Sequence, residues 1–175
     1  MMLWLKSAGV ILVILSSGIW GLMGARNLQL RVEQLKDLRM ALNFLEKEIA
    51  YMHTPLSSAL RKTGYFCASP IRWLFLESAE RLERKEGRTA YEAWLSGVYK
   101  LERASSLKTE DIELLKTGAM QIGISDVYEQ RKFFSMLQEE LKIMEEKAEK
   151  EAESGVKLWS YGGFILGAVI VLLFI

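Results

Sequence analysis

The chain has 175 residues, of which 50% are hydrophobic and 26% are charged, and its formal net charge is +1. This length allows one domain of ordinary size. The 23 basic residues are balanced by 22 acidic ones, which argues against the basic surface that nucleic-acid binding requires. The one cysteine, Cys67, cannot form an internal disulfide, and no zinc-site spacing is present.

Two apolar stretches without charged residues lie near the ends of the chain, at residues 7–25 and 158–175. At about 1.5 Å per helical residue, each covers about 27–28 Å, close to the roughly 30 Å of a bilayer's hydrocarbon core. We therefore expect two transmembrane helices in contact with lipid. A cleaved signal peptide is the alternative for the first stretch, because Lys6 precedes it. Aromatic residues suited to the membrane interface flank both stretches, namely Trp4, Trp20, Trp159 and Tyr161.

The charged residues gather between the two apolar stretches. The segment 26–157 contains 44 of the 45 charged residues, leaving only Lys6 outside it. Because cytoplasmic flanks of transmembrane helices are enriched in lysine and arginine, we expect this segment to be a cytoplasmic domain with both termini outside. The basic residues that carry this prediction are Arg26, Arg31, Lys36 and Arg39 after the first stretch, and Lys147, Lys150 and Lys157 before the second.

The segment 26–157 is predicted to be helical throughout, as a bundle of about six helices, which makes the chain all-α. It contains only two prolines and no sustained strand-like alternation. Helix starts are expected at Thr54-Pro55 and Ser69-Pro70, each as an N-cap residue followed by proline. Further starts are expected at a capping box formed by Thr89 and Glu92, and at Thr109-Glu110-Asp111.

Two long helices are predicted to pair through apolar stripes with alternating steps of three and four residues, the spacing of a coiled-coil seam. Since one helix leaves the membrane and the other returns to it, we expect an antiparallel stalk with the shorter helices at its distal end. Self-association of the same seams between chains, giving a homo-oligomer, is the alternative. The stripes are Leu35, Leu38, Leu42, Leu45, Ile49 and Met52 in the first helix, and Phe134, Leu137, Leu141, Met144 and Ala148 in the last.

The sequence gives little support for an enzyme, and we predict no catalytic residue, metal site or cofactor. It has no phosphate-binding glycine loop, nucleophile elbow or HExxH motif. His53 stands alone and is interpreted as a helix-end residue, whereas Cys67 is interpreted as a small buried hydrophobe. Four glutamates repeat every three residues from Glu77 to Glu86. A cation or partner site is one interpretation, but interleaved basic residues indicate a solvated, ion-paired face.

Small residues recur within both predicted spans. Such residues allow helices to approach closely, so we treat them as candidates for packing between transmembrane helices. The alternative explanation is that glycine is common in membrane helices whether or not it packs against another helix. The candidates are Ser17, Gly21 and Ala25 in the first span, and Gly163 and Gly167 in the second.

Several segments in order resemble the stage III sporulation protein AB family of endospore-forming bacteria. They are a glycine-bearing first span followed by Arg26, a helix ending in LEKEIAY at residues 45–51, HTPLSSAL at 53–60, YEAW at 91–94, GISD at 123–126 with Gln130, and a glycine-rich last span. The resemblance covers nearly the whole chain. One departure is Ile122, where the family pattern leads us to expect leucine before Gly123.

This resemblance implies a membrane component of the secretion channel built between mother cell and forespore, located in the mother-cell engulfing membrane. It also implies a helical domain similar to those of type II secretion and type IV pilus platform proteins. By that analogy the domain would bind a companion cytoplasmic ATPase, stage III sporulation protein AA, beside other membrane subunits of the channel. Fold analogy alone does not establish function.

The surface expected to bind the ATPase is the distal end of the domain, at Thr54, Pro55, Leu56, Ser125 and Asp126. The alternative is that these residues merely start helices. A scaffold without ATPase coupling, or a self-associating coiled-coil anchor, are the other function classes that the sequence leaves open.

Overall fold

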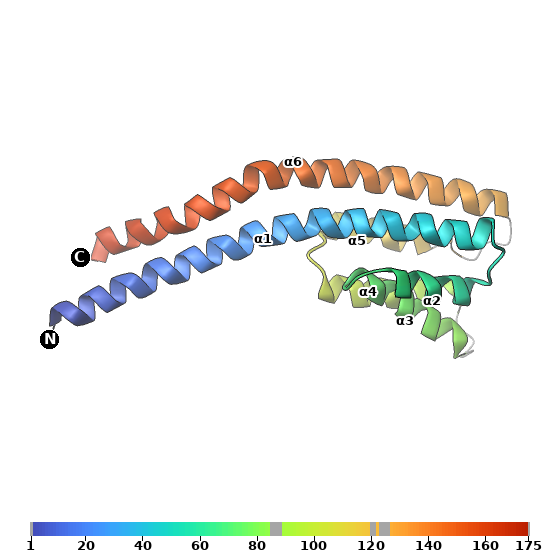
Figure 1. Cartoon of the computed structure of the whole chain (residues 1–175), viewed down its shortest axis with the longest axis horizontal. Coiled ribbons are helices and arrows are strands. Elements are labelled where there is room, and N and C mark those ends of the chain that lie inside the picture. The colour runs from blue at the N-terminus through green and yellow to red at the C-terminus, as the bar shows by residue number, and fades with distance from the viewer. Residues whose placement is uncertain (1, 85–88, 120–121, 123–126, 175) are drawn as a thin grey trace. The chain divides into compact units, whose positions relative to one another are not determined.

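The protein folds as six helices in a computed structural model that describes residues 2–84, 89–119, 122 and 127–174 (Figure 1). These residues contain no β-strand, so the predicted all-α fold is confirmed. The helices are α1 (Met2–Ala50), α2 (Leu56–Phe66), α3 (Ile71–Glu83), α4 (Ala90–Ala104), α5 (Thr109–Gly118) and α6 (Val127–Phe174).

The expected spans are not separate helices but the outer parts of α1 and α6. The chain forms two compact units: unit 1 contains Met1–Val32 and Lys147–Ile175, and unit 2 contains Glu33–Glu146. The chain therefore passes from one unit to the other inside a helix, at residues 32–33 and 146–147. These points lie within the segment 26–157 that the charge pattern assigns to the domain, and the membrane boundaries themselves stay a prediction.

Unit 2 is built around the pairing of α1 with α6. The stripe residues from Leu35 to Leu45 in α1 have no exposed surface, and Phe134, Leu137 and Leu141 of α6 are at most 1% exposed. The prediction was wrong at the end of the first stripe. Met52 is 70% exposed, because α1 ends at Ala50 and the chain turns away before reaching it.

The shorter helices lie along the side of α1 within unit 2, not beyond its end as predicted (Figure 1). Two contacts show the extent of this packing. Phe66 at the end of α2 stacks on Phe44 of α1, with ring centroids 4.7 Å apart. In the loop between α4 and α5, the Ser106 N–H donates to Oε1 of Gln34, at the start of the unit, over 2.8 Å. The side of α1 thus helps to cover the apolar faces of the short helices.

The contact between α3 and α4 is unusually close because of one glycine. A Cβ atom on Gly97 would lie 2.3 Å from the carbonyl oxygen of Leu74, so any side chain there would push the helices apart. Nearby, Trp94 is 1% exposed and its Nε1–H donates to the Leu115 carbonyl oxygen over 2.9 Å. This bond satisfies the polar end of the largest buried side chain, as burial of tryptophan requires.

All four expected helices begin within one residue of the predicted position, and at two of them the predicted first-turn residues also behave as expected. Thr89 and Glu92 form the predicted capping box at α4, and α5 begins at Thr109 with Asp111 accepting a hydrogen bond from the Lys108 N–H. The two proline-linked caps were wrong. Neither α2 nor α3 has a side-chain cap: each helix begins one residue after its proline, the Thr54 hydroxyl donates to Glu48, and the Ser69 hydroxyl accepts from Trp73.

Replacing Leu42 with alanine should destabilise the protein by about 2–5 kcal/mol, because the buried side chain leaves a cavity in the α1–α6 seam. Met40, two residues away and 46% exposed, is the matched control, and Met40→Ala should change stability by less than about 0.5 kcal/mol. Thermal and urea unfolding of the full chain in detergent, followed by circular dichroism, measures both. Equal losses for the two variants would contradict the seam described here.

Candidate functional site

The turn between α1 and α2 is the part of the predicted partner surface that the structure describes. Three consecutive residues, Tyr51, Met52 and His53, are exposed there. His53 adopts φ of 53°, a left-handed conformation that glycine commonly supplies at the end of a helix. The interpretation of His53 as a helix-end residue is therefore confirmed, and its conformation redirects the chain into α2.

Glu48 holds this turn from the last part of α1. Its Oε2 accepts hydrogen bonds from the Thr54 hydroxyl over 2.8 Å and from Lys62 Nζ over 2.6 Å, and its carbonyl oxygen accepts the Thr54 N–H over 2.9 Å. The hydrogen bond from Lys62, followed by that from Thr54, lowers the pKa of the Glu48 carboxyl group. The carboxylate therefore stays ionised at neutral pH and ties α1, the turn and α2 together.

The five predicted partner-binding residues differ in exposure, and the structure describes only three of them. Pro55 is exposed, while Thr54 and Leu56 are half-buried in the turn. Ser125 and Asp126 lie outside the described residues. The structure therefore brings together the first three, which are neighbours in sequence, and ATPase binding at this surface stays a prediction.

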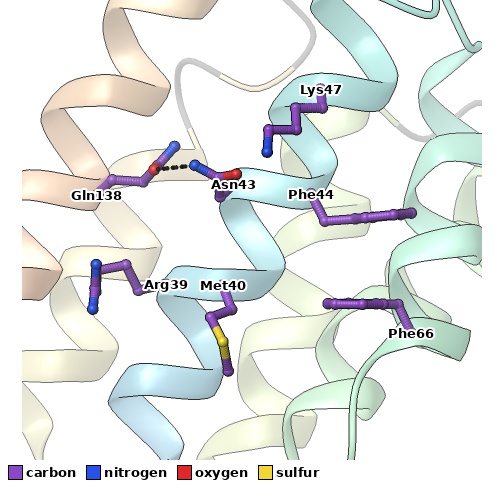
Figure 2. Close-up of a pocket in the computed structure, with 7 residues that line it drawn as sticks. All are labelled: Arg39, Met40, Asn43, Phe44, Lys47, Phe66 and Gln138. Carbon is purple, nitrogen blue, oxygen red and sulfur yellow. Dashed lines mark hydrogen bonds between the residues drawn. The ribbon is translucent and has the colours of Figure 1, made fainter.

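A groove beside this turn was not predicted from the sequence. It has a volume of about 300 Å³ and lies on the exposed side of α1, between α2 and α6 (Figure 2). One wall is the Phe44–Phe66 stack, and the other carries Gln138, whose Oε1 accepts a hydrogen bond from Asn43 over 3.1 Å. The lining residues are Arg39, Met40, Asn43, Phe44, Lys47, Phe66 and Gln138.

One border of this groove, the exposed face of α1, could have been predicted from the sequence. Lys36, Met40, Asn43 and Lys47 follow steps of four, three and four residues and are all exposed on one face of α1. That face could be read from helical periodicity. The aromatic wall could not, because Phe66 meets Phe44 only through the lateral packing of α2.

The predicted glutamate face is ion-paired, as far as it is described. Glu77 binds Arg81 over 2.8 Å and Lys100 over 2.6 Å. Two further pairs join α3 glutamates to arginines: Glu80 with Arg84, which follows α3, and Glu83 with Arg61 of α2. This part of the surface satisfies its own charges, which makes it a poor candidate for cation binding.

Within unit 1, the two terminal helical segments approach closely at three of the predicted small residues. A Cβ atom on Gly21 would lie 2.5 Å from the carbonyl oxygen of Trp159 and 3.1 Å from Cα of Gly163, and one on Gly163 would lie 2.6 Å from the carbonyl oxygen of Ser17. Ala25 and Gly167 are also buried. Packing of these residues inside a membrane stays a prediction.

An ion pair between a buried arginine and a half-buried glutamate accompanies this approach in unit 1. Arg31 is 2% exposed, and its Nη1 donates to Oε2 of Glu151 over 2.7 Å. Because removing one partner of a buried pair is costly, this contact favours one alignment of the two segments.

One described stretch is long and apolar enough to cross a membrane. It lies in α6, within Lys132–Leu172, and only 13% of its most apolar window is buried in the protein. The first predicted span includes residues 7–11, whose side chains lie outside the described part of the chain.

The fold and the apolar stretch define a class: an all-helical protein with a paired-helix domain and a segment suited to membrane association. Comparison with known proteins gives the family. The profile described as stage III sporulation protein AB matches residues 6–175, so the chain belongs to this family of sporulation proteins.

Two members illustrate the match. Stage III sporulation protein AB of Bacillus subtilis (strain 168) is 31% identical over 169 residues, which cover 97% of this chain and 98% of that protein. A solved structure of stage III sporulation protein AB is similar with a TM-score of 0.66 at 32% identity, covering 70% of this chain and 96% of its own.

The half-buried thiol of Cys67 should react slowly with maleimides. Burial, followed by the nearby charge of Asp37, raises its pKa from 9.0 to about 12, and Arg72 offsets this only in part. Because the thiolate is the nucleophile, its fraction at pH 8 falls by roughly a thousandfold, and we expect modification at least about a hundredfold slower than at an exposed cysteine. Rates measured at pH 8 on the native chain check this.

The control places a cysteine at the exposed position Ser58 in a Cys67→Ala background. If native Cys67 reacted as fast as Ser58→Cys, the thiol would not be shielded as described. In urea the two rates should converge, because unfolding removes the burial.

Proposed function

We propose that this chain is a membrane-anchored component of the sporulation channel between mother cell and forespore, and that unit 2 binds the companion cytoplasmic ATPase. Membership of the family supports the general role in sporulation. The ATPase partner rests on the likeness to platform domains of secretion systems. The observation that favours a particular surface is the exposed turn at residues 51–55, held rigid by Glu48.

The turn has features that suit protein binding. Tyr51 is 61% exposed and Met52 is 70% exposed, so the turn presents apolar surface. Aromatic and methionine side chains are enriched at protein interfaces. Because the turn is already ordered by the Glu48 contacts, a partner would not have to fix its conformation, and preorganisation of this kind favours affinity.

The mechanism would be mechanical. The ATPase would bind the turn and pass movement into α1, since the turn directly follows that helix and Glu48 links it to α2. Other channel subunits would contact the membrane-spanning segments. This chain would then need no catalytic residue of its own.

The alternative of a coiled coil between chains is disfavoured by the burial of the seams. Leu35, Leu38, Leu42 and Leu45 of α1 have no exposed surface within a single chain. Association through these residues would require unit 2 to open, at the cost of its core.

Charging the turn should prevent ATPase binding. We expect Met52→Glu in the turn, combined with Ser58→Glu at an exposed position in the first turn of α2, to reduce the ATPase recovered with the tagged full chain by at least about tenfold, because a charge placed in an apolar contact must be desolvated. Tyr91→Glu, at a 39% exposed site on α4, is the matched control and should leave recovery unchanged. The three proteins should have the same circular dichroism spectrum.

Two results would contradict this proposal in different ways. Full recovery with the charged turn would move the binding surface elsewhere on unit 2. Failure of the unaltered chain to retain the ATPase would leave a scaffold without ATPase coupling.

The location of unit 2 can be tested with the same cysteine used above. In a Cys67→Ala, Ser58→Cys chain, intact sporulating protoplasts treated with a membrane-impermeant maleimide should show no labelling, and lysis should restore it. This result is expected because the basic flanks of both spans favour a cytoplasmic domain. Labelling of intact protoplasts would place unit 2 outside and would exclude a cytoplasmic ATPase as its partner.

A further inference from the structure

Two exposed faces of unit 2 are opposite in charge and similar in length. The first is the basic face of α1, defined by Lys36, Met40, Asn43 and Lys47, which borders the groove. The second is the acidic face of α6, defined by Met136, Glu139, Ile143 and Glu146. From these two faces we infer that the basic face of one copy binds the acidic face of a second copy, so that the chains assemble head to tail.

The acidic face has no role in the core. Met136 is 55% exposed and Ile143 is 59% exposed, although they lie two turns apart on the same side of a helix whose opposite side is fully buried. Between Met136 and Glu146 the exposed charged residues are three glutamates, Glu139, Glu140 and Glu146, and one lysine, Lys142. Lys142 lies 3.8 Å from Glu139. Apolar and acidic side chains therefore alternate along the face, which is acidic overall.

The basic face has the opposite charge and an apolar centre of its own. Met40 is 46% exposed, and Phe66 beside it is 59% exposed although it stacks on Phe44. Lys36 and Lys47 lie at the two ends of the face, and Arg39 at its edge is bound to Glu145 over 2.8 Å. The groove itself is lined by Met40, Phe44 and Phe66 together with Lys47, and Lys36 lies outside this lining (Figure 2).

The two faces also match in length and periodicity. The basic face spans twelve residues and the acidic face eleven, so the end residues of each face lie about 15–17 Å apart along the helix. Their steps of three and four residues are those that allow two helices to pack along each other at a small crossing angle. In such packing Met136 and Ile143 would lie along the face that carries Met40 and Phe66. Glu146, at the end of its face, would lie opposite a lysine at the end of the other face.

This contact is heterologous, because each copy would use one face to bind and a different face to be bound. Repetition of such a contact gives a ring when the rotation closes and a line when it does not. A contact of two to three helical turns is small and weak by itself. Confinement of the chains to a membrane would raise their effective concentration and would favour assembly.

Disulfide cross-linking between two differently tagged full-length chains tests this pairing. Both chains carry Cys67→Ala, one also carries Met40→Cys, and the other also carries Ile143→Cys. In membranes under mild oxidation, we expect a product containing both tags at a yield at least roughly fivefold above that of matched pairs carrying the same cysteine twice. Glu113→Cys on α5, an exposed position on neither face, replaces Ile143→Cys as the control and should give only the background yield.

Charge exchange provides the second measurement. Lys36→Glu with Lys47→Glu, or Glu139→Lys with Glu146→Lys, should each lower the mixed product at least roughly fivefold, because like charges would meet across the contact. Combining the changes in every copy should restore the yield. Lys47→Gln, which removes the charge without reversing it, gives a smaller loss and serves where a reversal reduces folding, as judged by circular dichroism.

Three results would overturn the inference. One is a mixed product no more abundant than with Glu113→Cys. Another is an equally abundant product between two Met40→Cys chains, which would show a symmetric contact. The last is protection of Met40→Cys from maleimide by added ATPase without any cross-link between copies, which would assign the groove to the ATPase.

Discussion

The structure depends on the burial of one apolar seam between α1 and α6. In unit 2 this seam joins the α1 leucines to those of α6 and to Phe134, and all of these side chains are nearly inaccessible to solvent: Leu35, Leu38, Leu42 and Leu45 in α1, and Phe134, Leu137 and Leu141 in α6. Full burial of a leucine contributes about 1.5–3 kcal/mol, so four leucines in one stripe supply a large part of a marginal stability. The shorter helices then pack against a pair that is already formed. Without the seam, neither the α1–α2 turn nor the groove would have a rigid support.

Polar contacts decide how the paired segments align. Two helices that pair through a heptad-like stripe can shift along each other by a whole repeat, because leucine then meets equivalent apolar positions again. In unit 2, Arg39 binds Glu145, and Gln138 accepts from Asn43 while donating to Glu46 over 2.7 Å. A shifted alignment would leave the 8%-exposed Glu145 without its arginine, which is costly for a buried charge. In unit 1 the Arg31–Glu151 pair acts in the same way on its own two segments.

The sequence predicted most of what depends on local periodicity and little of what depends on lateral contacts. Helix class, the stripes and the Thr89 capping box follow from spacing along the chain. The failures at Thr54 and Ser69 arose because a hydroxyl near a proline has other partners in the fold, Glu48 and Trp73, that spacing does not reveal. The position of the short helices was also missed. Gly97 lies where α3 and α4 come closest. A glycine inside a helix often marks close packing against another element, so this residue carries some information about that contact.

Lateral packing also changes what the outer faces can do. Because α2 to α5 cover α1 from one side and α6 covers it from another, the stripe from Lys36 to Lys47 is left as a narrow exposed face with a groove beside it. The α6 stripe from Met136 to Glu146 is exposed because the opposite side of α6 is the one that packs in the seam. Mutational changes in the seam would therefore alter binding only by altering folding, whereas changes on the two outer faces can alter binding alone. That separation makes the contributions of the fold and of its partners measurable independently.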